Sequence, residues 1–281
     1  MNILRDWRPF KMKITKRKSI NAGVSIGDDG QFNFNWKTDN SESDILLLNQ
    51  DTSGTFDSEG VAYIYGYVFN PKSTGSQRKV FRDALKSEIT NTDIFISNDV
   101  DNFVENGVLR LENYKRFDEF SATVTIESTK PKSLVDIISM YFSEYLENTT
   151  PEFTFKLIKQ MYEDVEFDSV KAYNSLIDAG YRQYDANRVI SKVMRRFDSL
   201  KLTKQLFEMK KFLPREIREG FYNFLKFKTN EQAEAYMSLQ CVNVLIYDDF
   251  LTSGTTIKEI IRYLRSIHSE NTLTVFVLIK Q

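Results

Sequence analysis

Near its C-terminal end the chain alternates apolar runs with an amphipathic stretch. Val242–Tyr247 is mostly apolar without strict alternation, which is typical of a strand buried on both faces of a parallel sheet. Thr256–His268 repeats isoleucine and leucine at helical spacing, and Leu273–Ile279 is a second strand of the buried type. Strand, helix and strand in this order predict a right-handed βαβ unit.

Helical spacing dominates the region before this unit. Apolar residues between Leu134 and Leu146 recur with the period of a helix. One short apolar segment, Phe167–Tyr173, is predicted to be the first strand of the sheet. Further helices are predicted over Glu152–Tyr162, Asp185–Phe197 and Asn230–Leu239. We therefore expect residues 131–281 to form an α/β domain around a parallel sheet.

The first part of the chain has shorter runs, which turn signals separate. Its strongest predicted strand is Gly60–Asn70, which alternates aromatic and aliphatic residues, and core packing is the expected role of its aromatic side chains. Other predictions are a hairpin within Lys11–Trp36, a short helix over Gln77–Ser87, and strands over Asp93–Ser97 and Phe120–Ile126. The polar run STKPKS, residues 128–133, reads as a linker. Residues 1–130 are thus expected to be a β-rich α+β domain of unknown role.

The overall charge gives no indication of a polyanionic partner. The 281 residues contain 38 Lys or Arg and 39 Asp or Glu, for a net charge of −1. The N-terminal region could be a hood-like substrate domain, a module that binds a protein partner, or a nucleic-acid contact. The local cluster Lys11, Lys13, Lys16, Arg17 and Lys18 is a small argument for the last of these. The N-terminus lacks the apolar core of a secretory signal, and no run approaches 18 apolar residues. We expect a cytoplasmic protein without a membrane partner.

Single copies of cysteine and histidine limit the chemistry of the chain. Cys241 alone can form neither an internal disulfide framework nor a cysteine-built zinc site. A Ser-His-Asp triad would have to use His268. Cys241 is expected to be a small, semi-buried residue, and His268 is expected to be exposed or to interact with the C-terminal end of its helix.

Two adjacent carboxylates, Asp248 and Asp249, directly follow the apolar strand and precede the run TSGTT, residues 252–256. In open parallel sheets, ligands bind where strands end at their carboxyl edge. Backbone N–H groups at a helix start bind phosphate, and a glycine lets the phosphate approach closely. Carboxylates accept hydrogen bonds from vicinal hydroxyls and hold Mg²⁺ directly or through water. The stretch predicts a site for a ligand such as a ribose 5-phosphate.

Two other interpretations of the acidic pair are open at this point. Asp and Thr both cap helices well, so the stretch can serve the following helix alone. A phosphatase-type nucleophile fits less well, because adjacent carboxylates point to opposite sides of an extended chain.

The run VLIYDDFLTSGTT resembles the phosphoribosyl-pyrophosphate (PRPP) binding motif of type I phosphoribosyltransferases, and its place near the C-terminus resembles the ComF-like branch of that family. The motif covers about 15 residues, and a wider resemblance extends over Phe167 to Gln281. The resemblance implies a phosphoribosyltransferase, that is a glycosyltransferase, with Mg²⁺ as cofactor. It also implies that Asp248 and Asp249 contact the ribose hydroxyls and the metal. The loop residues Thr252, Ser253, Gly254, Thr255 and Thr256 would hold the 5-phosphate.

The resemblance also implies a pyrophosphate site upstream. Asn174 and Ser175 would lie at the tip of its loop, although the family more often has a glycine there. The basic stretch Arg195–Arg218 would supply cations, for which the candidates are Lys201, Lys204, Lys210, Lys211, Arg215 and Arg218; a solvated helix face is the alternative. Thr252 stands where 6-oxopurine enzymes carry an aspartate, which argues against a hypoxanthine or guanine acceptor.

Three functions are compatible with the sequence. The first is transfer of a phosphoribosyl group from PRPP to an unknown acceptor. The second is a non-catalytic sensor of PRPP or a nucleotide, and the third is an interaction protein in which the site no longer binds. PRPP is consumed only in the first and is not bound in the third.

Overall fold

In the computed structural model, the described residues are 23–26, 32–35, 46–48, 55–57, 60–91, 98–128, 133–146, 153–251 and 254–280. The strand predicted over Asp93–Ser97, the basic cluster between Lys11 and Lys18, and the loop residues Thr252 and Ser253 lie outside them. The description that follows refers to the described residues alone.

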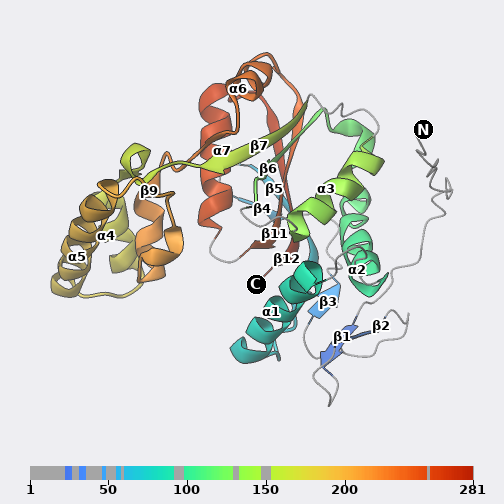
Figure 1. The fold of residues 1–281 in the computed structure, drawn as a ribbon, viewed down its shortest axis with the longest axis horizontal. Coiled ribbons are helices and arrows are strands. Elements are labelled where there is room, and N and C mark those ends of the chain that lie inside the picture. The colour runs from blue at the N-terminus through green and yellow to red at the C-terminus, as the bar shows by residue number, and fades with distance from the viewer. Residues whose placement is uncertain are drawn as a thin grey trace, which may run out of the picture.

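A mostly parallel sheet forms the centre of the structure (Figure 1). Its parallel strands lie side by side in the order β7-β6-β11-β12-β5. Their bounds are Thr154–Lys159 for β7, Ala122–Ile126 for β6, Asn243–Leu251 for β11, Thr272–Lys280 for β12 and Ala62–Phe69 for β5. Three antiparallel strands complete the sheet, namely β10 (Leu225–Phe227) beside β7, and β3 (Leu46–Leu48) and β4 (Thr55–Phe56) beside β5. The fold is therefore α/β, as the sequence predicts.

This sheet draws strands from both sides of the division predicted between residues 130 and 131. β5 pairs with β12 from Ala62–Thr274 to Val68–Lys280, and β6 pairs with β11. Residues 60–128 also contain α1 (Gly75–Asn91) and α2 (Asn98–Val108), so this segment contributes helices as well as strands. The predicted hairpin is confirmed, because β1 (Gly23–Ile26) and β2 (Phe32–Asn35) pair antiparallel.

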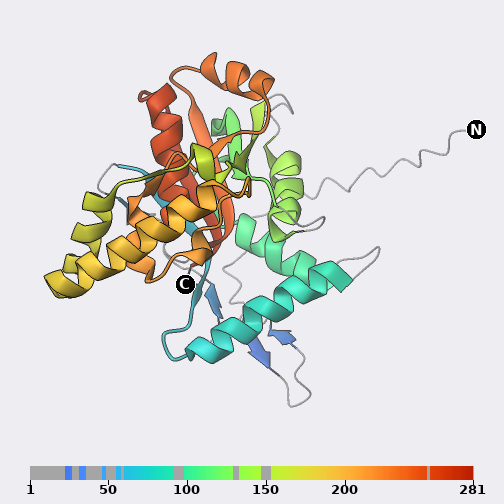
Figure 2. The same ribbon diagram turned by 60° about the vertical axis from the view of Figure 1, so that its left-hand side comes forward.

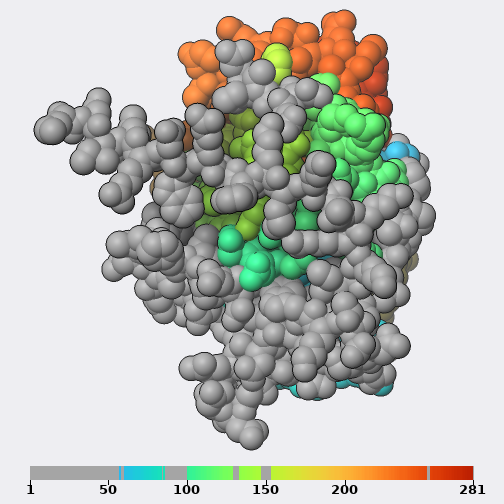
Figure 3. All heavy atoms as spheres, turned by 90° about the vertical axis from the view of Figure 1, so that its right-hand side faces the viewer, coloured from blue at the N-terminus to red at the C-terminus, as the bar shows by residue number. Residues whose placement is uncertain are grey.

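Helices cover both faces of the sheet because its strands are apolar on both sides. Leu245 and Tyr247 of β11 pack with α1, α2 and α3 (Leu134–Tyr145). Val244 and Ile246 pack instead with α6 (Asn230–Met237) and α7 (Thr255–Ile267). Figure 3 shows the side of the molecule on which part of α3 is visible in yellow-green. The short 3₁₀ helices are η1 (Leu111–Asn113), η2 (Phe117–Glu119), η4 (Tyr162–Asp164), η5 (Met209–Lys211) and η6 (Arg215–Gly220).

The βαβ unit is confirmed, and two upstream predictions are wrong. β11, α7 and β12 occupy the predicted positions, and β11 and β12 are parallel neighbours. The helix predicted over Glu152–Tyr162 is strand β7, in which Phe155 and Leu157 are buried on alternate positions. The strand predicted over Phe167–Tyr173 is mostly helix α4 (Ser169–Asp178), which Asp168 caps by accepting the N–H groups of Val170 and Lys171 at 2.9 Å.

Residues 160–224 form an arm between the neighbouring strands β7 and β10. The arm contains α4, α5 (Gln183–Lys201) and the small sheet of β8 (Glu166–Phe167) and β9 (Phe221–Tyr222). Figures 1 and 2 show α4 and α5 projecting beyond α7, to one side of the sheet. The arm is filled by a cluster of aromatic rings, Tyr162, Phe167, Phe197, Phe207, Phe212, Phe221 and Phe224. Ring packing of this kind makes the arm a compact unit.

The environments of His268 and Cys241 differ from expectation. His268 follows the last residue of α7, but it is buried, with Nε2 2.8 Å from the carbonyl oxygen of Met237 and Nδ1 3.1 Å from Glu270 Oε1. Cys241 is exposed and has a φ of 57°. Neither residue lies at the carboxyl edge of the sheet. None of the described helices is both long enough and apolar enough to cross a membrane, and the compartment stays a prediction.

Candidate functional site

Strand β11 brings the acidic pair to the carboxyl edge of the sheet. It lies between β6 and β12, and four consecutive residues, Val244 to Tyr247, are buried. β11 pairs with β6 through three residues, from Val244 opposite Ala122 to Ile246 opposite Val124. Asp248 and Asp249 therefore lie beyond the part of β11 that pairs with β6. On the other side Asp248 still pairs with Val277 of β12. The strand order therefore places the acidic pair at the centre of the edge where ligands bind in such sheets.

The two carboxylates are half-buried and belong to the strand itself. Asp248 Oδ1 accepts the N–H of Asp249 at 2.8 Å, which orients the Asp248 carboxylate along the backbone. The alternation of strand residues directs neighbouring side chains to opposite faces. The acidic pair thus offers two separately oriented acceptors.

Helix α7 begins at a left-handed glycine. Gly254 occupies the N-cap position with φ 73° and ψ −5°, a conformation that glycine adopts without strain. Thr255, which is buried, and Thr256 are the first residues of the helix. The positive end of the α7 dipole therefore points toward the carboxyl edge.

Buried polar side chains behind the acidic pair fix its position. The Tyr247 hydroxyl lies 2.7 Å from Ser139 Oγ of α3, and Thr125 Oγ1 donates to the Tyr247 carbonyl oxygen at 2.9 Å. Burial raises the pKa of the Tyr247 phenol to about 12. Tyr247 is thus a neutral anchor that ties the end of β11 to β6 and α3.

Two neighbouring strands add a lysine and an aromatic ring to this edge. The registers align Asp248 with Val277, and Val277 with Tyr65 of β5, so the three residues form one row across the sheet. Lys280, near the end of β12, holds its Nζ 4.4 Å from the centre of the Tyr65 ring. Neither residue can be assigned to this edge from the sequence, because only the pairing of distant strands places it there.

The residues predicted to bind pyrophosphate lie in the arm. Asn174 and Ser175 are within α4, so the predicted loop tip is wrong. Lys201 is the last residue of α5, where its Nζ lies 4.8 Å from the Phe197 ring, and Lys204 follows in a turn with φ 49°. Arg215 begins η6. The Asp168 cap, followed by residues compatible with a helix, is the sequence signal that could have identified α4.

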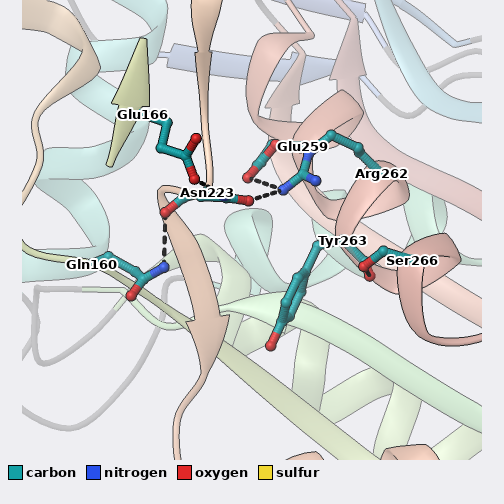
Figure 4. Close-up of polar contacts among 7 residues, drawn as sticks. All are labelled: Gln160, Glu166, Asn223, Glu259, Arg262, Tyr263 and Ser266. Atoms are coloured by element: carbon teal, nitrogen blue, oxygen red, sulfur yellow. Dashed lines mark hydrogen bonds and ion pairs between the residues drawn. The ribbon is translucent and has the colours of Figure 1, made fainter. Parts of the chain in front are cut away.

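A polar network ties the arm to α7 (Figure 4). Glu259 is buried, and its two oxygens accept from Arg262 Nε at 2.7 Å and Nη2 at 3.0 Å. Arg262 Nη2 also donates to Asn223 Oδ1 at 2.6 Å, while Asn223 Nδ2 donates to Glu166 Oε1 at 2.6 Å. Hydrogen bonding to Glu259 raises the pKa of Arg262. The helix that begins at the candidate site is therefore fastened directly to the arm.

Two further hydrogen bonds join the two ends of the arm, where the chain leaves β7 and returns to β10. Gln160 Nε2 donates to the Asn223 carbonyl oxygen at 2.8 Å, and the Gln160 N–H donates to the Phe224 carbonyl oxygen at 2.9 Å. In the first turn of α7, Lys258 Nζ lies 3.1 Å from Glu219 Oε1 of η6. The arm thus contacts α7 at both its first and its second turn.

The described residues contain no group of three or more His, Cys, Asp and Glu side chains arranged to hold a metal ion. Mg²⁺, however, commonly binds one or two carboxylates and completes its shell with water and substrate phosphate. The pair Asp248 and Asp249 fits that mode and does not fit a cage made by the protein alone.

No protein-family model matches the sequence, and no curated protein is significantly similar to it. The chemistry of the site therefore has to be argued from its own geometry.

Proposed function

We propose that the carboxyl edge of β11 and the start of α7 bind the ribose 5-phosphate part of PRPP or of a nucleotide, in a type I phosphoribosyltransferase-like arrangement. The observation that carries this proposal is the combination of the acidic pair at the end of a central buried strand with a left-handed glycine at the start of the next helix. The first provides acceptors for a diol and the second provides donors for a phosphate.

In this proposal each part of the site has a separate task. Asp248 and Asp249 orient the ribose through its hydroxyls. The backbone from Thr252 to Thr256 holds the 5-phosphate, with Gly254 giving the phosphate close access. Mg²⁺, when bound, would neutralise charge on the leaving pyrophosphate during transfer of the phosphoribosyl group to an acceptor. Lys280 lies at the same edge and can approach a second phosphoryl group.

Binding without transfer is a second candidate function. The position of Asn174 and Ser175 in a helix of the arm favours it, since the predicted pyrophosphate loop is not formed by these residues. Both candidates predict PRPP binding at the same residues. They differ in whether pyrophosphate is released.

Isothermal titration of PRPP into the full chain, with and without Mg²⁺, tests the site. We expect saturable binding, and at least about a tenfold loss of affinity in the double variant Asp248→Asn, Asp249→Asn, because hydrogen bonds to charged groups contribute roughly 1.5–3 kcal/mol each. Circular dichroism and urea unfolding check that the variant folds. Absence of binding by the folded wild type would reject both candidate functions and favour the interaction protein. A coupled assay for pyrophosphate then separates the first candidate from the second.

Gly254→Val is expected to weaken PRPP binding about tenfold or more. Its branched side chain disfavours the left-handed backbone and occupies the space through which the phosphate approaches. Gly180→Val is the matched control, because Gly180 also has a positive φ, 90°, with open space around it, but lies in the arm. Both variants carry similar backbone strain, so equal affinities in the titration would show that Gly254 has no role in binding.

A further inference from the structure

One segment of the arm, residues 182–218, carries a concentration of positive charge that the chain as a whole does not have. Between residues 182 and 218 there are eleven Lys or Arg and four Asp or Glu, whereas the full sequence is balanced at 38 and 39. Part of this segment, Arg195–Arg218, was predicted to supply cations for pyrophosphate. The structure instead arranges much of it along α5 and the turns that follow.

Helix α5 turns its cations away from the protein. Its buried residues, Ala186, Ile190, Val193 and Phe197, recur at helical spacing and define the inner face. With 100° between successive residues, Arg188, Lys192 and Arg195 fall almost opposite that face, and all three are exposed. They extend over about 10 Å of the helix, at 1.5 Å per residue. We call Arg188, Lys192 and Arg195 the row on α5, and Arg196, which is also exposed, lies beside it.

These cations are not neutralised by neighbouring carboxylates. In the described parts of the chain, Arg188, Lys192, Arg195 and Arg196 take part in no ion pair, and Arg195 Nε donates only to the Ser191 carbonyl oxygen, at 3.3 Å. Helix α7 shows the opposite arrangement. Its outward cations Lys258 and Arg262 bind Glu219 and Glu259. The row on α5 is therefore available to a partner that brings its own negative charge.

An aromatic ring stands at the end of this row. Tyr184 lies one turn before Arg188 on the same side of α5, and 77% of its surface is exposed. An exposed tyrosine next to cations can stack a base whose phosphates the cations bind. A phospholipid headgroup has no aromatic ring to stack, and an acidic peptide has one only where its sequence includes an aromatic residue. Phe197 packs α5 onto the aromatic cluster inside the arm, and the helix projects beyond the sheet (Figure 2).

We propose that the outer face of α5 binds single-stranded nucleic acid, with Arg188, Lys192, Arg195 and Arg196 on the phosphates and Tyr184 stacked on a base. This surface is separate from the carboxyl edge of β11, and its role does not depend on PRPP binding. Binding by phosphate contact and stacking carries little sequence preference. The affinity should fall with salt, with a slope of log K against log salt of about −2.8 for four phosphate contacts on a single strand.

Fluorescence anisotropy with a labelled mixed-sequence single-stranded oligonucleotide tests the surface, using the full chain over a salt series. The triple variant Arg188→Gln, Lys192→Gln, Arg195→Gln is expected to bind at least about tenfold more weakly and to lower the salt slope by about 2. Glutamine suits exposed helix positions, so the fold should persist. Tyr184→Ala should reduce affinity without changing the slope.

The control is a variant with the same change in net charge, Lys159→Gln, Lys171→Gln, Lys226→Gln, at three exposed positions away from the row. It should bind like the wild type. A second comparison replaces the five cations between Lys11 and Lys18. Loss of oligonucleotide binding in this N-terminal variant, together with unchanged binding in the α5 triple variant, would overturn the proposal. Absence of binding, tighter binding to duplex of the same sequence, or binding only to vesicles containing phosphatidylserine would overturn it as well.

Discussion

Replacing Arg262 with methionine is expected to destabilise the protein by about 3 kcal/mol at neutral pH, because it leaves the Glu259 carboxylate buried without its partner. The Glu259 side chain is 3% exposed and that of Arg262 is 42% exposed, so the main cost falls on the glutamate. The variant also loses the hydrogen bond from Arg262 to Asn223, which connects α7 to the arm. Unfolding in urea, which is uncharged, measures the change in free energy.

Two further variants separate the buried charge from other effects of the substitution. Lys258→Met removes an ion pair one turn earlier on the same helix, but the lysine is 61% exposed, and a cost below about 1 kcal/mol is expected. Adding Glu259→Gln to Arg262→Met removes the buried charge and should restore a large part of the lost stability. Equal costs for Arg262→Met and Lys258→Met would contradict the argument.

Gly66→Val is expected to cost about 3 kcal/mol or more, because backbone atoms surround the position. A Cβ at residue 66 would lie 2.9 Å from the carbonyl oxygen of Leu278 and 3.0 Å from the Cα of Gly107. Neither atom is at the end of a flexible side chain, so β5, β12 and α2 would have to separate. Urea unfolding measures the change, and Gly66→Ala serves if the valine variant does not fold.

Gly75→Ala provides the matched control for this prediction. Gly75 begins α1, and a Cβ there has no atom within 4 Å. Its substitution should not destabilise the protein and should stabilise it by up to about 1 kcal/mol, since alanine reduces the conformational freedom of the unfolded chain and favours the helix. If Gly66→Ala were as stable as Gly75→Ala, the close approach of β5 and α2 would not constrain the fold.

Local patterns predicted the βαβ unit, because its strands and helix each bury a continuous apolar surface. The failure at β7 has an equally local cause. The alternation of Phe153, Phe155 and Leu157 with more polar residues has the period of a strand, which contradicts the helix predicted over Glu152–Tyr162. Asp168 is likewise a local signal for the start of α4, within the segment predicted to be a strand.

Non-local pairing could not be predicted in this way. β5 and β12 lie more than two hundred residues apart in the sequence, and nothing in either strand specifies the other as its neighbour. The same limit applies to the candidate site. Asp248 and Gly254 come from one continuous stretch and could be identified together, whereas Tyr65 and Lys280 join them only through the strand order.

The arm enters and leaves the sheet at a single point. Lys159 and Leu225 are paired residues of adjacent antiparallel strands, separated by the spacing that a two-residue turn can bridge. The main chain of the sheet therefore has the same path whether residues 160–224 form a folded unit or a short turn. A change in the length of this segment therefore leaves unchanged the order of the strands that hold Asp248 and Asp249.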